Sequence, residues 1–125
     1  MSLLFNIHQP TLLGHVQVLL NMLAFGCSPQ TALDAPRIAI SPHDTAHPEA
    51  LVHLESGVPP EAIQGLRKLG HNVRVETGEE RVGYFGRGQI IRVRRRDKEV
   101  ECGDGWVYSA GSDMRGDGAA LAFNG

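Results

Sequence analysis

One segment near the start of the chain restricts the fold more than any other. Residues 14–26 read GHVQVLLNMLAFG. Apolar side chains recur there at helical spacing and cover most of the helix circumference, at Val16, Val18, Leu19, Leu20, Met22, Leu23 and Phe25. A helix with so wide an apolar surface is buried on more than one side, so we expect it to lie inside a larger body and to end at Gly26.

After this helix the chain alternates between short helices and strands. Ser28 can cap a second helix that begins at Pro29 and ends before Pro36, because a residue preceding proline avoids helical geometry. A third helix is expected at residues 60–69, with Ile63, Leu66 and Leu69 on its inner face. Strands are expected at 37–40, 51–55, 71–76 and 88–96. The return strand is expected to begin at 99–102 and to be completed or continued by 106–110.

The strands at the end of the chain indicate the fold class. A short turn at residues 97–99 joins two of them, and strands joined in this way pair antiparallel. Residues 41–50 and 77–83 are expected to be loops. The pattern predicts an α+β class, with a mainly antiparallel sheet covered by helices, in a single domain or subdomain spanning residues 1–125.

Composition excludes several classes of function. Hydrophobic residues make up 42% of the chain and charged residues 21%, as in ordinary globular domains. A formal net charge of -2 gives no reason to expect nucleic acid as a partner. No apolar run reaches the ~18–20 residues that cross a bilayer, and the first residues lack a signal-peptide pattern. We expect no membrane partner, and the compartment stays open.

The two cysteines and one histidine-rich loop are the candidates for metal or disulfide chemistry. Cys27 and Cys102 lie too far apart for a metal-type pair, which leaves two buried free thiols as the expectation and one disulfide as the alternative. His43, Asp44 and His47 could meet one cation. Because prolines bracket them, no helix presents them on one face, and we expect a solvated loop without a metal.

Three further patterns suggest chemistry and are better explained by structure. GYFGRG at residues 83–88 has the wrong glycine spacing for a dinucleotide site, so a turn, a bulge or a close backbone approach is expected. Cys27 and His15 lie at opposite ends of one helix and cannot act as nucleophile and base. The basic run comprises Arg92, Arg94, Arg95, Arg96 and Lys98. It is expected to form a solvated strand face, or an edge strand that its charges keep from aggregating.

Four stretches in order along the chain resemble the C-terminal part of the γ-glutamyltranspeptidase family. QP at residues 9–10 with GHVQVLLNML at 14–23 resembles the family's QPQGHVQVLLNML helix. FG with PQ and ALDAPR, within residues 25–37, resembles its FG…PQEALDAPR segment. LESGVPP at 54–60, followed by LGH at 69–71, is similar to its LE.G.PP segment, and SDMRGDGAA at 112–120 to its terminal SDPR.DGAA.

The resemblance implies a fold and an activity. The family belongs to the N-terminal-nucleophile hydrolases, whose fold is a four-layer αββα sandwich. Its precursors cleave themselves, and the new N-terminal Thr acts as nucleophile with its own amine as base. The enzymes transfer or hydrolyse the γ-glutamyl group of glutathione and related amides. A partial αββα layer, completed by the N-terminal or large-subunit portion as partner, is therefore implied.

The sequence departs from the family where the chemistry would be. The family's nucleophilic Thr would precede Met1, and its pair of glycines before QPQGH, which helps to stabilise the oxyanion, is replaced by MSLLF. The QPQGH motif reads QPTLLGH, and Met114 replaces a proline. We therefore expect no catalytic, cofactor-binding or metal residues here, and Gly14–Gln17, Asp113 and Arg115 correspond to scaffold positions.

Two functional hypotheses remain from the sequence. The first is an inert structural portion of an N-terminal-nucleophile enzyme. The second is a free-standing, non-catalytic binding or regulatory module that oligomerises. In either case an apolar helix needs a cover, and we expect a homodimer when the chain is isolated.

Overall fold

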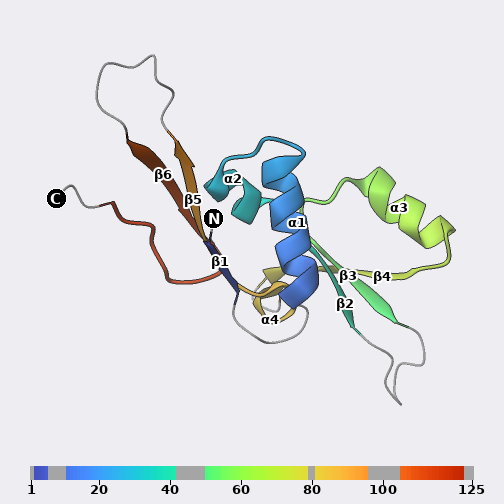
Figure 1. Cartoon of the computed structure of the whole chain (residues 1–125). Helices are drawn as coiled ribbons and strands as arrows, with labels where there is room; N and C mark the ends of the chain where they lie inside the picture. The colour runs from blue at the N-terminus through green and yellow to red at the C-terminus, as the bar shows by residue number, and fades with distance from the viewer. Residues whose placement is uncertain (1, 6–10, 42–49, 79–80, 96–104, 123–125) are drawn as a thin grey trace.

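The computed structural model places a pair of helices between two small sheets (Figure 1). It describes residues 2–5, 11–41, 50–78, 81–95 and 105–122. The elements in chain order are β1 (Ser2–Phe5), α1 (Thr11–Leu23), α2 (Pro29–Asp34), β2 (Ile38–Ser41), β3 (Leu51–Glu55), α3 (Pro60–Lys68), β4 (Asn72–Glu76), α4 (Arg81–Phe85), β5 (Gly88–Arg95) and β6 (Trp106–Ser112).

Each sheet has three strands. The first has the order β1-β5-β6 and is antiparallel throughout. The second has the order β2-β3-β4, in which β2 and β3 are antiparallel and β3 and β4 are parallel, joined through α3. The α+β class and the mainly antiparallel pairing are thus confirmed, with the strands divided between two sheets.

The apolar side chains form two separate cores. One joins α1, α2 and β5 through Val18, Met22, Ala32, Leu33 and Ile90. The other lies between α3 and the second sheet and contains Val52, Leu54 and Val73, with Ile63 and Leu66 of α3 packed against them. Among the described residues, no helix is both long and apolar enough to cross a membrane.

Helix α1 buries only one of its apolar faces within the described part of the chain. Val18 and Met22 are buried. Leu12, Leu20 and Leu23 on the other side remain 79%, 51% and 75% exposed. The wide apolar circumference seen in the sequence therefore corresponds to one buried and one exposed apolar face.

Two sets of hydrogen bonds fix the first turn of the short helix α2. Ser28 Oγ accepts a hydrogen bond from Thr31 N at 3.1 Å, which confirms the predicted cap. The side chain of Gln30 then pairs with the backbone of β6 as another strand would: Nε2 donates to Ser112 O at 2.9 Å and Oε1 accepts from Ser112 N at 3.0 Å. Next to this contact, a Cβ on Gly111 would lie 2.8 Å from Gln30 N, so the close approach requires glycine.

Several predicted boundaries were wrong, each for a local reason. Helix α1 begins at Thr11 rather than near Gly14, and β1 was not foreseen because its residues carry no period. Helix α4 lies partly in the expected loop 77–83, and its five residues are too few to show helical periodicity. Leu69 is 77% exposed instead of facing inward, because α3 ends at Lys68 and the chain turns away at Gly70.

The close approach of α2 to β6 gives a stability prediction. A Gly111→Ala substitution should lower the free energy of unfolding by about 1–3 kcal/mol, because the new methyl group meets the backbone of Gln30. Gly65 in α3 is the matched control, since a Cβ there meets nothing within 4 Å. Gly65→Ala should raise stability by about 0.5–1 kcal/mol. Urea unfolding of both variants is the measurement, and equal effects would contradict the prediction.

Candidate functional site

The central strand of the second sheet, β3, has one apolar and one polar face, and both are buried. Alternate side chains of a strand point to opposite sides. Val52 and Leu54 of β3 therefore face α3, whereas His53 and Glu55 face the other way. Buried carboxylates are costly unless they are paired, so the polar face must contain its own partners.

The first buried group on this side is a cluster of four charged residues, Arg37, Glu55, Asp113 and Arg115, which we call the charge cluster. Arg115 lies between the two acids: Nη1 donates to Asp113 Oδ1 at 2.9 Å, Nε donates to Glu55 Oε1 at 2.8 Å, and Nη2 donates to Glu55 Oε2. Arg37 Nη2 donates to the other oxygen of Asp113 at 2.6 Å. Two cations and two anions therefore cancel within the cluster.

The same side chains hold backbone groups from several elements. Leu33 O, near the end of α2, accepts from Arg37 Nη2 at 3.0 Å and from Arg115 Nη1 at 2.8 Å. Phe85 O, at the end of α4, accepts from Arg37 Nη1 at 3.2 Å. Gly88 N, at the start of β5, donates to Asp113 Oδ2 at 2.9 Å. Cations at helix C-termini and an acid on a backbone N–H are favourable in each case.

The charge cluster shifts the pKa values of three of its members. Burial lowers the pKa of Arg37, and the neighbouring Arg115 cation lowers it further. Burial alone would raise the pKa of Asp113, but the Arg37 charge and the hydrogen bonds from Arg115 outweigh it, so this pKa is lowered. Burial opposes the charge of Arg115 too, but its hydrogen bonds to Glu55 and Asp113 raise its pKa.

The second buried group is a line of three hydrogen-bonded side chains, Ser41, His53 and Glu76, which we call the polar triad. Ser41 Oγ lies 2.7 Å from His53 Nε2, and His53 Nδ1 lies 2.7 Å from Glu76 Oε1. The ring of Tyr84 from α4 stacks on the imidazole of His53, with 4.1 Å between ring centroids. His53 and Glu76 are 2% and 1% exposed, whereas Ser41 is half-buried.

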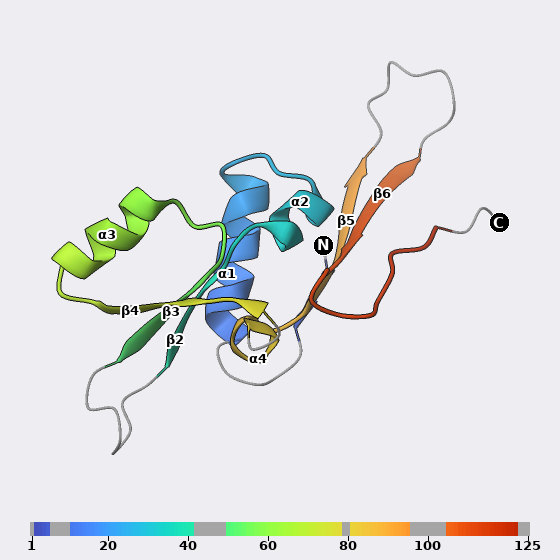
Figure 2. The ribbon, with the colours of Figure 1, turned by 180° about the vertical axis from the view of Figure 1, so that it is seen from behind.

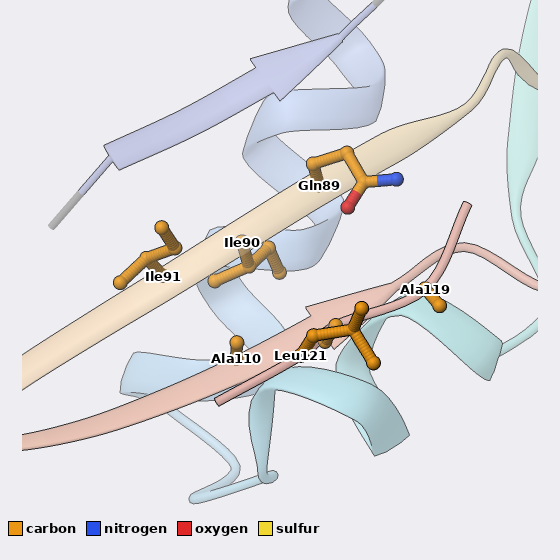
Figure 3. A pocket seen from close by; sticks show the side chains of 8 residues that line it. Gln89, Ile90, Ile91, Ala110, Ala119 and Leu121 are labelled. Atoms are coloured by element: carbon orange, nitrogen blue, oxygen red, sulfur yellow. The ribbon is translucent and has the colours of Figure 1, made fainter. Parts of the chain in front are cut away.

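Outside these two groups, a pocket of about 220 Å³ lies between the first sheet and the C-terminal segment. Figure 3 shows Gln89, Ile90 and Ile91 of β5 on one side and Ala119 and Leu121 on the other. Seen from behind, the segment after β6 turns back alongside that strand (Figure 2). The volume is below the ~300 Å³ of ordinary ligand sites, and the lining side chains are mostly aliphatic. The pocket therefore provides little polar chemistry.

The structure brings together few of the residues that the sequence singled out. The loop with His43, Asp44 and His47 lies outside the described residues, as does Cys102. Cys27 is a half-buried free thiol. Among the described residues, no group of three metal-ligating side chains occurs.

The remaining candidates also have structural roles. Gly86 follows α4 with a φ of 64°, a conformation that favours glycine, and the chain passes from this helix end into β5. Of the basic run, Arg96 and Lys98 lie outside the described residues; Arg94 and Arg95 are exposed and Arg92 is half-buried, as a solvated strand face requires. Asp113 and Arg115, predicted as scaffold positions, are both in the charge cluster.

Comparison with known proteins gives the family. The sequence model described as gamma-glutamyltranspeptidase matches residues 9–123. The chain belongs to the γ-glutamyltranspeptidase family. A comparison with curated protein sequences returns no significant match.

Solved structures agree with this assignment. A cephalosporin acylase from Bacillus halodurans is similar with a TM-score of 0.68 and 34% identity, covering 90% of this chain and 18% of that one. An acivicin-inhibited γ-glutamyltranspeptidase gives a TM-score of 0.68 at 19% identity, covering 93% and 53%. The γ-glutamyltranspeptidase from Pseudomonas nitroreducens complexed with L-DON gives a TM-score of 0.64 at 18% sequence identity. The match covers 98% of this chain and 56% of that one. The chain thus spans between 18% and 56% of the length of these relatives, and its fold is that of the matching part of these N-terminal-nucleophile hydrolase structures.

The sequence reasoning missed the polar triad and the pairing inside the charge cluster. Ser41 was placed in a loop, and the alternation of residues 51–55 identified a strand without showing that both of its faces are buried. The one usable signal was a histidine and a glutamate in strands that also carry core aliphatic residues. The parallel register that brings Glu76 to His53 has no sequence signature.

The charge cluster gives a prediction on stability and its pH dependence. Asp113→Asn should lower the free energy of unfolding by about 3–5 kcal/mol at pH 7, because it leaves buried arginine charge uncompensated. Since the pKa of Asp113 is lowered in the folded state, its stabilisation is fully present above the ordinary aspartate pKa of about 3.9 and is lost as pH falls below it. The variant should therefore lose less stability than the wild type on acidification.

The measurement is urea unfolding at pH 7 and at a series of acidic pH values. Asp117→Asn, at an exposed aspartate of the same segment, is the control and should change stability by less than about 0.5 kcal/mol. If Asp113→Asn matched this control, the charge cluster would not stabilise the fold.

Proposed function

We propose that this chain is the C-terminal structural portion of a γ-glutamyltranspeptidase-like N-terminal-nucleophile enzyme and is inert in γ-glutamyl chemistry as this stretch alone. The whole enzyme would transfer or hydrolyse the γ-glutamyl group of glutathione-type amides. The charge cluster is the observation that carries the proposal. Arg37, Glu55 and the Asp113–Arg115 pair come from three of the four family-like segments, and these side chains are committed to one another.

The fourth family-like segment also makes a structural joint. Gln17 of α1 pairs with the backbone of Ile38 at the start of β2: Oε1 accepts from its N–H at 2.7 Å and Nε2 donates to its carbonyl at 2.9 Å. All four segments therefore supply connections between elements. Such residues support a site built elsewhere in an enzyme rather than touching substrate.

The role of the final segment fits what is known of one relative. The structure of the acivicin-inhibited γ-glutamyltranspeptidase is described as revealing critical roles for its C-terminus in autoprocessing and catalysis. In this chain the segment with Asp113 and Arg115 is held inside the fold by Glu55 and by the end of α2. We infer that it would serve such roles by fixing the geometry of the neighbouring elements.

The exposed apolar face of α1 is a further surface for a partner to cover. Leu12, Val16, Leu20 and Leu23 recur at helical spacing along the exposed side of the helix. The rest of the enzyme would cover this face, as the partial coverage of the relatives suggests. A free-standing module that oligomerises through the same face is the second candidate function.

The first test is enzymatic. The purified chain should not release the chromophore from a γ-glutamyl anilide above the uncatalysed rate, and it should not transfer the γ-glutamyl group to a dipeptide acceptor. A cleavage rate that follows the protein through successive purification steps would refute the inert structural role.

The second test concerns association. The isolated chain should form a homodimer through α1, because covering several hundred Å² of apolar surface at about 25 cal/mol per Å² yields several kcal/mol before ordering costs. A Leu12→Gln/Leu20→Gln double variant should weaken the dimer at least about tenfold, as a loss of 1.4 kcal/mol does. Leu69→Gln, at an exposed leucine away from α1, should not.

Sedimentation equilibrium over a wide concentration range measures both variants against the wild type. A wild-type chain that stays at 13.6 kDa at every concentration would contradict the proposed dimer.

A further inference from the structure

The polar triad lies outside the four family-like segments, and the proposed scaffold role does not require it. A serine hydroxyl, a histidine and a carboxylate follow one another at 2.7 Å and 2.7 Å, with one ring nitrogen toward each partner. This order of groups is the one that activates a serine for attack on a carbonyl carbon.

Strand register alone places these groups in line. Ala39 lies opposite His53 in the antiparallel β2–β3 pair, so Ser41 is the diagonal neighbour of His53 on the same face. Arg74 lies opposite His53 in the parallel β3–β4 pair, so Glu76 is its diagonal neighbour on the other side. The three side chains therefore cross the sheet in one oblique row.

The surroundings restrict the imidazole to one orientation. Tyr84 stacks on one side of the ring at an interplanar angle of 19°, and Glu76 holds Nδ1. The other acid on this face, Glu55, is taken by Arg115, which leaves Glu76 as the partner of His53. Arg74 Nε also lies 3.2 Å from Glu76 Oε1 and fixes the same carboxylate oxygen.

The three side chains of the polar triad differ in solvent exposure, and the serine is the most exposed of them, as a nucleophile must be. His53 and Glu76 are shielded from water. Ser41 is half-buried at the last position of β2, so its hydroxyl lies at the border of the buried region. A small acyl compound would have to approach only this end of the row.

We propose that Ser41 is an activated nucleophile that accepts the acyl group of small, reactive carboxylic esters. The Ser41 oxygen forms a bond to the ester carbonyl carbon while His53 Nε2 takes the hydroxyl proton. The bond from that carbon to the alcohol oxygen then breaks, and the alcohol leaves with the proton returned by His53. Glu76 acts as a positioning residue by holding the histidine ring. This chemistry does not use an N-terminal Thr and is independent of γ-glutamyl transfer.

The test uses 4-nitrophenyl acetate with the folded 125-residue chain. The site of acetylation is read by peptide mapping and its rate by intact mass. Ser41 should be acetylated at least about tenfold faster than in the same chain denatured in urea, because general-base assistance alone contributes a factor of 10² or more. Ser109, a half-buried serine of β6, is the internal control. It should not be acetylated faster in the folded chain than in the denatured chain.

Variants separate the roles of the triad members. Ser41→Ala should remove the fast acetylation, and Ser109→Ala should leave it unchanged. His53→Gln and Glu76→Gln, where thermal unfolding shows them folded, should slow acetylation at Ser41 by at least about tenfold. Equal rates at Ser41 in the folded and the denatured wild type, or a folded His53→Gln chain with the wild-type rate, would overturn the proposal.

Discussion

The fold depends on the neutral charge cluster in which Arg115 is paired with two carboxylates. Without Arg115, Glu55 and Asp113 would remain buried and would each lose an ion pair. Ion pairs of this kind seldom add net stability over apolar packing, but breaking one by removing a single partner is costly. These ion pairs also join α2, α4, β3, β5 and the segment after β6, and the observed arrangement of these elements satisfies all of these hydrogen bonds together.

The charge cluster explains why the second sheet can bury a polar face. Hydrophobic packing under α3 holds one side through Val52, Leu54 and Val73. On the other side the charge cluster takes up Glu55, and α4 covers His53 with the ring of Tyr84. The polar triad occupies this face, where apolar side chains could have formed a simpler core. A buried polar group of this kind is expected to contribute either to the specificity of the fold or to chemistry.

Much of the fold could be read from the sequence, because its main signals are local. The serine–proline pair Ser28–Pro29, the glycine after α1, and the alternation in β3 and β4 each act within a few residues. The candidate site could not be read in the same way. The pairing of Arg37 with Asp113 and of Glu55 with Arg115 joins residues 76 and 60 positions apart, and the row of Ser41, His53 and Glu76 depends on two strand registers. Periodicity carries no information on such contacts.

The family-like segments contain structural residues rather than reactive groups. The contacts of these residues explain why the segments are recognisable. A residue that joins three or four elements through charge-assisted hydrogen bonds tolerates little change in size, charge or geometry. Arg37 donates to one carboxylate and three backbone carbonyls, and neither lysine nor glutamine offers such a fork of donors. Short motifs built on such residues remain recognisable in a chain whether or not it supplies reactive groups. In the proposed role, the chain would supply an enzyme with a scaffold that has an exposed apolar face on α1. The proposed serine chemistry lies outside the recognisable segments, in the polar triad that includes Ser41.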